Sequence, residues 1–231
     1  MKIEKLIVQL SVALLAVASA SAQGTFQNLN FEQASPVIVV GSPYYPYEVT
    51  AASALPDWTV TEGGVQQTQI TENDPSLGAP WVVLIGPNGG NSGYAPIDGY
   101  YSVLLQGSGV PQVPAISQTG LIPAGTQSLL FEAQSAGFGS LAVDIGTQTV
   151  PFVAVGTGPN YTLYAANISA WAGETEQLTF SAQESTSGLN NWEIDDISFS
   201  SQTVPEPSPL ALAGVGALVF ALYRRFAPKR P

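Results

Sequence analysis

The sequence predicts an all-β domain with the architecture of a single jelly-roll β-sandwich. Short apolar runs recur along the chain, Gly, Pro, Asn and Ser separate them, and no segment between residues 23 and 200 keeps a helical period. The alternation of period two is clearest where Leu141, Val143 and Ile145 share one face of a segment. Many short strands joined by such turns are typical of a β-sandwich or barrel.

The first element is a predicted secretory signal peptide over residues 1–22. Two lysines precede an apolar run at 6–17, and a stretch of small residues follows it. We expect cleavage between Ala22 and Gln23, and cleavage after Ala20 is the alternative. An uncleaved anchor is less favoured, because the apolar run is shorter than the roughly 20 residues that a membrane span needs.

The segment 23–200 is predicted to form one β-sandwich domain, because about 180 residues are enough for one well-covered core. The longest irregular stretch is 76–99, whose Gly- and Asn-rich part is the kind of loop that often carries function in a sandwich. The expected strands in chain order are 25–32, 36–40, 58–60, 65–70, 81–85, 100–106, 115–119, 128–134, 140–145, 150–155, 161–168, 177–183 and 192–200.

The charge distribution excludes several classes of partner. Residues 23–203 hold 15 of the 17 acidic residues, all except Glu4 and Glu206, and no Lys, Arg or His, so their formal charge is −15. Such a domain repels nucleic acid and anionic membrane surfaces. It can form no side-chain salt bridge, and the lack of cysteine rules out disulfides, which a domain of this size does not need for export.

The same composition restricts catalysis. Without His, Cys or Lys there is no Ser-His triad, thiolate, Schiff base or imidazole metal ligand between the two ends. A pair of carboxylates could still hydrolyse a glycoside, and Glu174, Glu176 and Glu184 flank a predicted strand. Nothing in the sequence fixes two acids at the required separation. A secreted, carboxylate-dependent glycan-active enzyme of β-sandwich fold is therefore the alternative hypothesis, and we expect no catalytic residues.

Aromatic and amide residues in loops are candidates for carbohydrate binding. A sugar site needs an exposed aromatic face with hydrogen-bonding groups nearby. Three of the four tryptophans, Trp58, Trp81 and Trp192, sit in apolar strands and are expected in the core, and Trp171 stays undecided. The candidate sugar-binding residues are Tyr44, Tyr45, Tyr47, Asn88, Asn91 and Tyr94.

The adjacent acids Asp195 and Asp196 are predicted to include one that is at least partly buried. In a regular strand Asp195 would share the core face with Ile197, while Asp196 would lie on the face of Ile194. A buried carboxylate needs a partner, and no basic side chain is available. Backbone N–H groups, hydroxyl groups, a shifted pKa or a bound cation are the remaining choices.

The last 28 residues combine a Pro205-Glu206-Pro207 triplet, a short apolar segment at 210–223 and a basic cluster that includes Arg224 and Arg225. This arrangement resembles the PEP-CTERM sorting signal of Gram-negative bacteria. The resemblance implies a Pro- and Ser-rich linker at 201–209, a hydrophobic sorting helix at 210–223 and a basic cytoplasmic tail at 224–231. It also implies cleavage by an exosortase at the inner membrane. A plain C-terminal membrane anchor is the alternative.

Several segments of the mature chain resemble the jelly-roll domains of PEP-CTERM exported proteins, which are similar to galactose-binding-like and carbohydrate-binding-module sandwiches. The segments are N-x-N-F-E at 28–32, A-L-P-D-W-T-V at 54–60, D-G-Y-Y-S-V-L-L-Q at 98–106, the run at 116–133 and I-D-D-I-S-F-S at 194–200. The resemblance implies that Glu32 and Asp196, with Asp195 beside them, help to hold a structural Ca²⁺. An acid pair capped by backbone and hydroxyl groups without metal is equally favoured.

The sequence thus predicts an exported, exosortase-sorted protein of the cell surface or extracellular matrix, with a structural or carbohydrate-binding role. The expected partners are signal peptidase and exosortase during export and an extracellular polysaccharide afterwards, with no nucleic acid. The expected route passes through the inner membrane before processing. A structural Ca²⁺ is the only cofactor that the sequence suggests.

Overall fold

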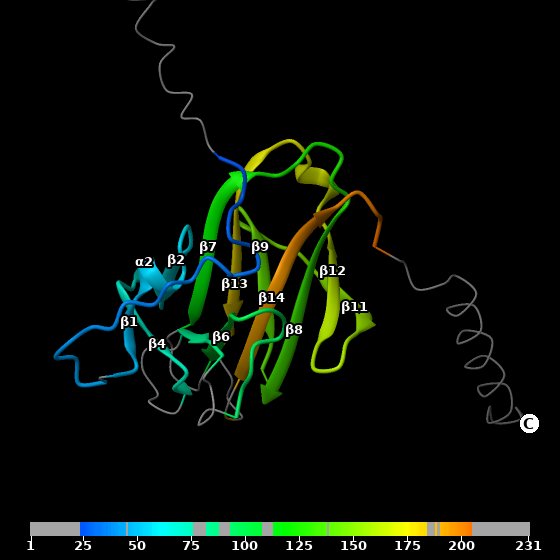
Figure 1. The fold of residues 1–231 in the computed structure, drawn as a ribbon. Coiled ribbons are helices and arrows are strands. Elements are labelled where there is room, and N and C mark those ends of the chain that lie inside the picture. Colours follow the sequence, from blue (N-terminus) through cyan, green and yellow to red (C-terminus); the bar gives the residue numbers. More distant parts are fainter. Residues whose placement is uncertain are drawn as a thin grey trace, which may run out of the picture.

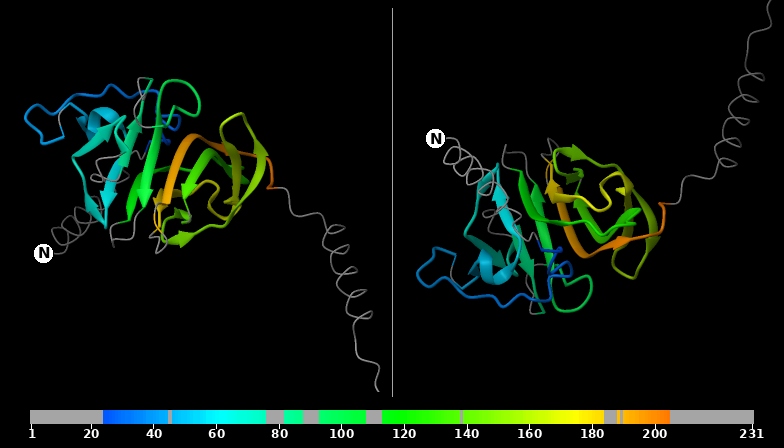
Figure 2. Two further views of the ribbon diagram at one scale, coloured as in Figure 1. Left: turned by 90° about the horizontal axis from the view of Figure 1, so that it is seen from below. Right: turned by 90° about the horizontal axis from the view of Figure 1, so that it is seen from above.

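The computed structural model describes residues 24–204, apart from 45, 76–81, 88–92, 108–112, 138, 184–187 and 189. Two β-sheets pack face to face, and Figures 1 and 2 show the layers from three sides. The predicted all-β sandwich is therefore confirmed. The sheet orders are β1-β4-β5-β6-β14-β8-β12-β11 in the eight-stranded sheet and β10-β9-β13-β7-β2-β3 in the six-stranded sheet.

The strands are short at the N-terminal edge and long in the middle of the sandwich. The eight-stranded sheet consists of β1 (Glu48–Thr50), β4 (Gln69–Glu72), β5 (Val82–Ile85), β6 (Ser102–Gly107), β14 (Asn190–Ser200), β8 (Ser128–Gly137), β12 (Thr162–Asn167) and β11 (Phe152–Thr157). The six-stranded sheet consists of β10 (Gln148–Thr149), β9 (Leu141–Ile145), β13 (Thr175–Ala182), β7 (Pro114–Leu121), β2 (Thr59–Glu62) and β3 (Val65–Gln66).

The chain crosses between the sheets at almost every connection in its C-terminal half, as in a jelly roll. Strand β6 is followed by β7 in the other sheet, β8 returns, and β13 and β14 repeat the crossing. The last strand, β14, lies between β6 and β8 in the middle of its sheet, where Figure 1 shows it in orange. Among the described strands, all pairings are antiparallel except that of β4 with β5.

Most predicted strands are confirmed within a few residues, but the first two predictions were wrong. Residues 25–32 and 36–40 contribute only single bridges, Thr25 to Leu121 and Ile38 to Val49. Residues 29–33 form turns instead, with Phe31 at φ 58° and its side chain fully buried. The chain bends there because this conformation brings the ring into the core, at a strain that the burial offsets.

Three smaller elements also differ from the sequence-based expectation. The predicted strand at 65–70 divides into β3 and β4, which belong to different sheets. Strands β1 and β10, which were not predicted, are three and two residues long. A four-residue helix, α2 (Ala51–Ala54), and the 3-10 turn η2 (Ser169–Trp171) are too short to give a periodic signal.

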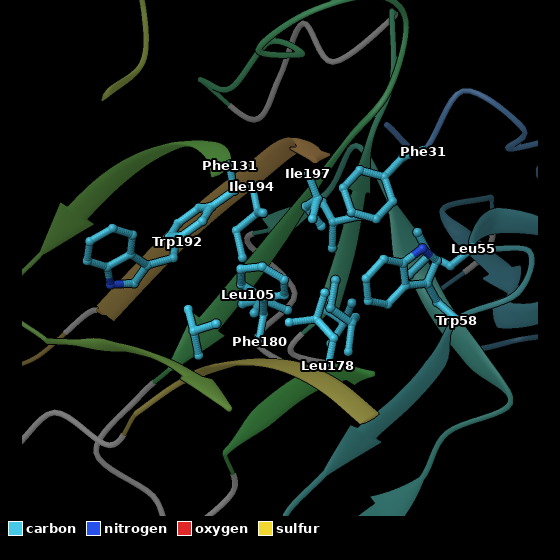
Figure 3. Close-up of a cluster of buried hydrophobic side chains, with 14 of the residues drawn as sticks. Phe31, Leu55, Trp58, Leu105, Phe131, Leu178, Phe180, Trp192, Ile194 and Ile197 are labelled. Atoms are coloured by element: carbon cyan, nitrogen blue, oxygen red, sulfur yellow. The ribbon is translucent and has the colours of Figure 1, made fainter. Parts of the chain in front are cut away.

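The main core lies between the two sheets, where strand residues of period two meet (Figure 3). Phe131 is fully buried, and its ring centroid lies 5.2 Å from Phe180 of the facing sheet and 5.4 Å from Tyr164. At the other end, Trp58 packs against Phe31 and donates its indole N–H to the Asn28 carbonyl oxygen at 2.9 Å. The indole N–H is thus satisfied although the ring is buried.

A second, smaller cluster covers the outer face of the eight-stranded sheet. Val83, Ile85 and Leu104 form it, and Tyr94 packs against them. Strands β5 and β6 are therefore buried on both faces, which explains their unbroken runs of apolar residues. Trp58 and Trp192 lie in the core as predicted, Trp171 packs partly buried against it, and Trp81 lies outside the described residues.

The predicted signal peptide, with Ala22 and Gln23, and the C-terminal segment from Pro205 onward lie outside the described residues. These include Glu206, Pro207, Arg224, Arg225 and the apolar segment 210–223. Between residues 24 and 204, the described helices are all too short to cross a membrane.

We predict that Phe131→Ala lowers the free energy of unfolding of the 23–204 domain by about 3–5 kcal/mol, because it leaves a cavity between the two sheets. Val153→Ala on the edge strand β11, where the side chain is 44% exposed, should change it by less than about 0.5 kcal/mol. Urea titration followed by tryptophan fluorescence measures both values. Equal effects of the two substitutions would contradict the position of Phe131 in the core.

Candidate functional site

A β-bulge in β14 sets the geometry of the acidic site. The register between β14 and β8 shifts between Asp195 and Ser198, and Asp196 takes a left-handed conformation with φ 43°. Asp195 therefore lies on the outer face with Glu193, while Ile197 packs into the core. The prediction that Asp195 shares the core face with Ile197 was wrong, because it assumed a regular strand. The prediction that one acid is buried is confirmed, since Asp195 is 1% exposed.

The carboxylate of Asp195 holds a loop onto the sheet. Its Oδ2 accepts the backbone N–H of Asp98 at 3.1 Å, and its Oδ1 accepts the N–H of Asp196 at 2.8 Å. Glu32 holds the same loop from the other side, since its Oε1 accepts the N–H groups of Tyr100 and Tyr101 at 2.7 and 2.9 Å. We call residues 97–101 the anchored loop. Gly99 at its centre has φ 58° and a Cβ there would meet Glu32, so glycine is required.

Five acidic residues influence one another around this loop: Glu32, Asp98, Glu132, Asp195 and Asp196. Burial raises the pKa of Asp195 to about 8, against two backbone hydrogen bonds that lower it. Burial also raises the pKa of Asp196, and the charges of Asp98 and Glu32 raise it further. Burial is the main cause of the raised pKa of Glu132 as well, and the nearby Tyr161 hydroxyl partly opposes it.

This arrangement brings together the three residues predicted to bind Ca²⁺, but it does not make a ready set of acidic ligands. Within the ranges that the structure describes, no three carboxylates converge closely enough to hold a metal ion. One oxygen of Glu32 and both oxygens of Asp195 are already hydrogen-bonded to backbone N–H groups. A cation here would need Asp196, the second oxygen of Glu32, and carbonyl or water oxygens to complete its shell.

A further acid, Glu193, is fully buried on the same face of β14, two residues before Asp195. It accepts hydrogen bonds from the hydroxyl of Ser102 and from the amide of Gln134, at 2.5 Å for the latter. Burial raises its pKa, and these two bonds partly oppose the rise. The three side chains connect β6, β14 and β8 across the outer face, which is a structural role.

The predicted sugar-binding residues do not form one described site. Tyr44 and Tyr47 share a turn before β1, closed by the hydrogen bond from Tyr47 N to Tyr44 O at 2.8 Å. Tyr94 instead covers β5 and β6, and its hydroxyl accepts a hydrogen bond from Asn191 at 2.9 Å. The remaining three, Tyr45, Asn88 and Asn91, lie outside the described residues.

The structure shows a groove that the sequence did not predict, with a volume of about 340 Å³. It lies where β8 continues past β12: Thr162 at the start of β12 pairs with Ala133, whereas β8 runs on to Gly137. The turn between β11 and β12 forms the other wall. The lining residues are Ala133, Gln134, Ser135, Thr157, Gly158, Pro159, Asn160, Tyr161, Thr162 and Tyr164. None of these ten residues is Asp, Glu, Lys, Arg or His. Seven of them, including both tyrosines, carry an amide or a hydroxyl group.

The sequence did not predict roles for Asp98, Glu132 or the groove turn, because these roles depend on contacts across the sheet. Only the turn itself has a sequence signal. Gly158-Pro159-Asn160-Tyr161 is a turn motif between two strands, and it puts an amide and an aromatic hydroxyl at the same end of a hairpin. The acids considered for catalysis lie elsewhere: Glu174 is exposed in a turn after η2 and Glu176 is on β13, while Glu184 lies outside the described residues.

We predict that the domain becomes more stable as the pH falls from about 9 to about 5, measured by thermal unfolding with a chelator present. The folded-state pKa of Asp195 is about 8 and its ordinary value is 3.8, so the folded protein binds an extra proton between these values. Its contribution is complete below about pH 4 and is lost as the pH rises through 8. One such proton corresponds to a slope of about 1.4 kcal/mol per pH unit.

Asp195→Asn should flatten this slope, because the amide cannot ionise, although its single oxygen replaces the two carboxylate oxygens that accept the N–H groups of Asp98 and Asp196. Asp144→Asn is the matched control, since Asp144 lies on β9 of the other sheet and accepts a hydrogen bond from Thr149. A slope that Asp195→Asn leaves unchanged would show that Asp195 ionises normally.

Comparison with known proteins gives a match to one family model, and the solved structures that resemble this chain include two weak likenesses. No curated protein matches the chain. A structure described as TmCBM61 in complex with β-1,4-galactotriose has 16% identity and a TM-score of 0.45, covering 78% of this chain and 99% of that one. The enzymatically active domain of tailspike protein 4 from bacteriophage CBA120 has 12% identity and a TM-score of 0.32, covering 63% and 19%. Similarity at this level says nothing about ligand or activity.

The sequence match lies in the C-terminal segment. Residues 203–225 match the model of the PEP-CTERM protein-sorting motif, which confirms the interpretation of the Pro-Glu-Pro triplet, the apolar segment and the first two arginines of the basic cluster. The motif indicates export, attachment to the membrane before sorting, and processing by an exosortase in a Gram-negative bacterium. The chain is thus an exported protein that carries a PEP-CTERM sorting motif behind a β-sandwich domain.

Proposed function

We propose that the mature domain binds polysaccharide at the cell surface or in the extracellular matrix and does not act on it chemically. The observation that carries this proposal is the groove beside β8. Its volume of about 340 Å³ is within the range of small-ligand sites, and its lining offers hydroxyl and amide groups with no ionised side chain. Groups of this kind bind the hydroxyls of a sugar by hydrogen bonds that fix orientation.

The alternative of a glycan-active enzyme has less support. Hydrolysis of a glycoside by the common route needs two carboxyl groups facing each other across the bond, and the groove lining contains none. Among the described acids, Glu32 and Asp195 are bound to backbone N–H groups and Glu193 to Ser102 and Gln134. Acids with such hydrogen bonds have a structural role, because they attach loops and neighbouring strands to one another.

The function is tested by placing the exported protein on an array of extracellular polysaccharides. We expect it to retain at least one of them and to release no reducing sugar from any during long incubation, because it has a groove but no facing acid pair. Release of reducing ends that Glu132→Gln or Asp196→Asn abolishes would establish the enzyme instead. Retention of none would refute the binding role.

We also propose that Ca²⁺ binds beside the anchored loop, through Asp196 and the second oxygen of Glu32 together with backbone carbonyl oxygens and water, with Asp195 beside them. Five acids lie there, the charges of Asp98 and Glu32 raise the pKa of Asp196, and residues 23–203 contain no basic side chain to compensate them. A hard divalent cation would remove that repulsion, and it prefers oxygen ligands of this kind. The left-handed residue Asp196 keeps its conformation when replaced by Asn, which tolerates positive φ.

If this site exists, chelation should lower the melting temperature of the domain and added Ca²⁺ should restore it. At 100 times its Kd, a cation that binds the native state alone stabilises it by about 2.7 kcal/mol. Asp196→Asn should abolish the response without changing the circular dichroism spectrum. Mg²⁺ is the control, because its small octahedral shell fits such a site poorly. Equal stabilisation by both ions, unaffected by Asp196→Asn, would leave only general screening of a strongly acidic domain.

A further inference from the structure

We infer that the groove between β8 and the β11–β12 turn is the glycan site, and that it takes an uncharged hexose polymer with Tyr161 as its positioned aromatic contact. This inference rests on the proposed function and adds the place, the contact residues and the chemical class of the ligand. None of the residues that form it were among the candidates from the sequence.

The shape of the groove follows from the pairing of the strands. Strand β12 begins at Thr162 opposite Ala133, so residues 134–137 of β8 have no neighbour on that side in the ladder. They keep their partners on the other side, where Gln134 pairs with Glu193 and Ser135 with Trp192 of β14. The floor of the groove is therefore a rigid strand with one free backbone edge, which offers peptide groups as well as side chains to a ligand.

The turn that forms the opposite wall is fixed by two hydrogen bonds. Gly158 N donates to Tyr161 O at 3.0 Å and closes the turn. The amide of Asn160 donates to the carbonyl oxygen of Ile97 at 3.3 Å, which attaches the turn to the anchored loop. The Tyr161 hydroxyl lies near the carboxylate of Glu132 on β8, and this neighbour raises the pKa of Tyr161. A wall held in this way does not have to be ordered when the ligand binds.

Gly158 is what allows the Tyr161 ring to lie where it does. A Cβ at residue 158 would come within 2.2 Å of ring atom Cε1 and 2.3 Å of Cζ. The ring therefore rests directly on the glycine backbone, and any side chain at residue 158 would displace it. Gly158 acts as a positioning residue, and Tyr161 is the group that meets the ligand.

Deeper in the groove, a second tyrosine is held by the core. The Tyr164 ring is stacked on Phe131 with centroids 5.4 Å apart and an interplanar angle of 21°. It also meets the edges of Phe152 at 5.2 Å and Trp192 at 6.0 Å. Three aromatic rings thus fix the Tyr164 ring, and a ring fixed in this way provides apolar contact at a low cost in conformational entropy.

Charge decides the class of glycan. The groove lining is uncharged, but Glu132 and Asp98 lie next to its wall, and the domain carries a formal charge of −15 without any cation. Uronate or sulfated polymers would be repelled. A polymer with free amino groups would be attracted by the whole surface, in a way that salt screens and that does not depend on the groove. Binding that depends on this lining is therefore binding of neutral sugars.

The test uses the exported protein and five immobilised polymers. Three are neutral (β-1,4-galactan, β-1,3-glucan and dextran), chitosan carries amino groups, and alginate carries uronate groups. We expect retention on at least one neutral polymer, equal at low and high salt, and none on alginate. Tyr161→Ala should weaken that retention at least about tenfold, the loss expected for one well-placed contact group.

Gly158→Ala should weaken binding by a similar factor, but have no further effect in a Tyr161→Ala background, because its only role is to place that ring. The matched control is Tyr44→Ala with Tyr47→Ala, which removes two other loop tyrosines and should change affinity less than about twofold. Melting temperatures of all variants are compared with that of the parent, so that unfolding is separated from loss of contact.

Each other outcome overturns the inference in a distinguishable way. Neutral binding that depends on Tyr44 and Tyr47, or that ignores the groove substitutions, would leave the proposed function standing and refute this site. Retention on chitosan or alginate alone would refute the neutral class. Retention on none of the five polymers would refute this inference, and retention on none of the polysaccharides of the wider array would remove the proposed function as well.

Discussion

The structure depends on one electrostatic constraint, which is that no cationic side chain lies between residues 6 and 223. A carboxylate that is buried in this domain cannot be paired with Lys, Arg or His, so it must accept hydrogen bonds from neutral donors or take up a proton. Both solutions are present. Glu32 and Asp195 accept backbone N–H groups, Glu193 accepts a hydroxyl and an amide, and the pKa of Asp195 is raised to about 8. The acids thereby become the groups that fix loops onto the sheets.

The anchored loop shows how far this effect reaches. Asp195 and Glu32 hold it through the backbone N–H groups of Asp98, Tyr100 and Tyr101, and Ile97 in turn accepts the amide of Asn160. The acidic cluster and the groove turn are therefore parts of one hydrogen-bonded assembly. A change in charge at Asp195 or Asp196 can reach the wall of the groove through the anchored loop. This loop is hydrogen-bonded to Asp195 at Asp98 and to the groove turn at Ile97.

The lack of cationic side chains also favours a binding role over a catalytic one for this domain. General acid and base chemistry by carboxylates needs two acids that are free to face a substrate. Here the buried acids are already engaged with the protein, and the groove is lined by amides and hydroxyls that can hydrogen-bond a sugar without changing protonation state. Such a surface, on a chain with a C-terminal sorting motif, is consistent with the proposed binding of neutral sugars.

The sequence alone determined the features that depend on local pattern. Alternation of apolar residues fixed the sandwich and most of its strands, and the triplet, apolar segment and basic cluster identified the sorting motif. The short strands β1 and β10 and the turn at Phe31 could not be predicted, because they exist only through pairing or burial against distant segments. The bulge at Asp196 reversed the faces of the residues around it, which no period-two reading can anticipate. Tertiary structure alone decided that Gln134 of β8 meets Asn160 and Tyr161 of the β11–β12 turn at one groove, because strand register sets which side chains become neighbours across a sheet.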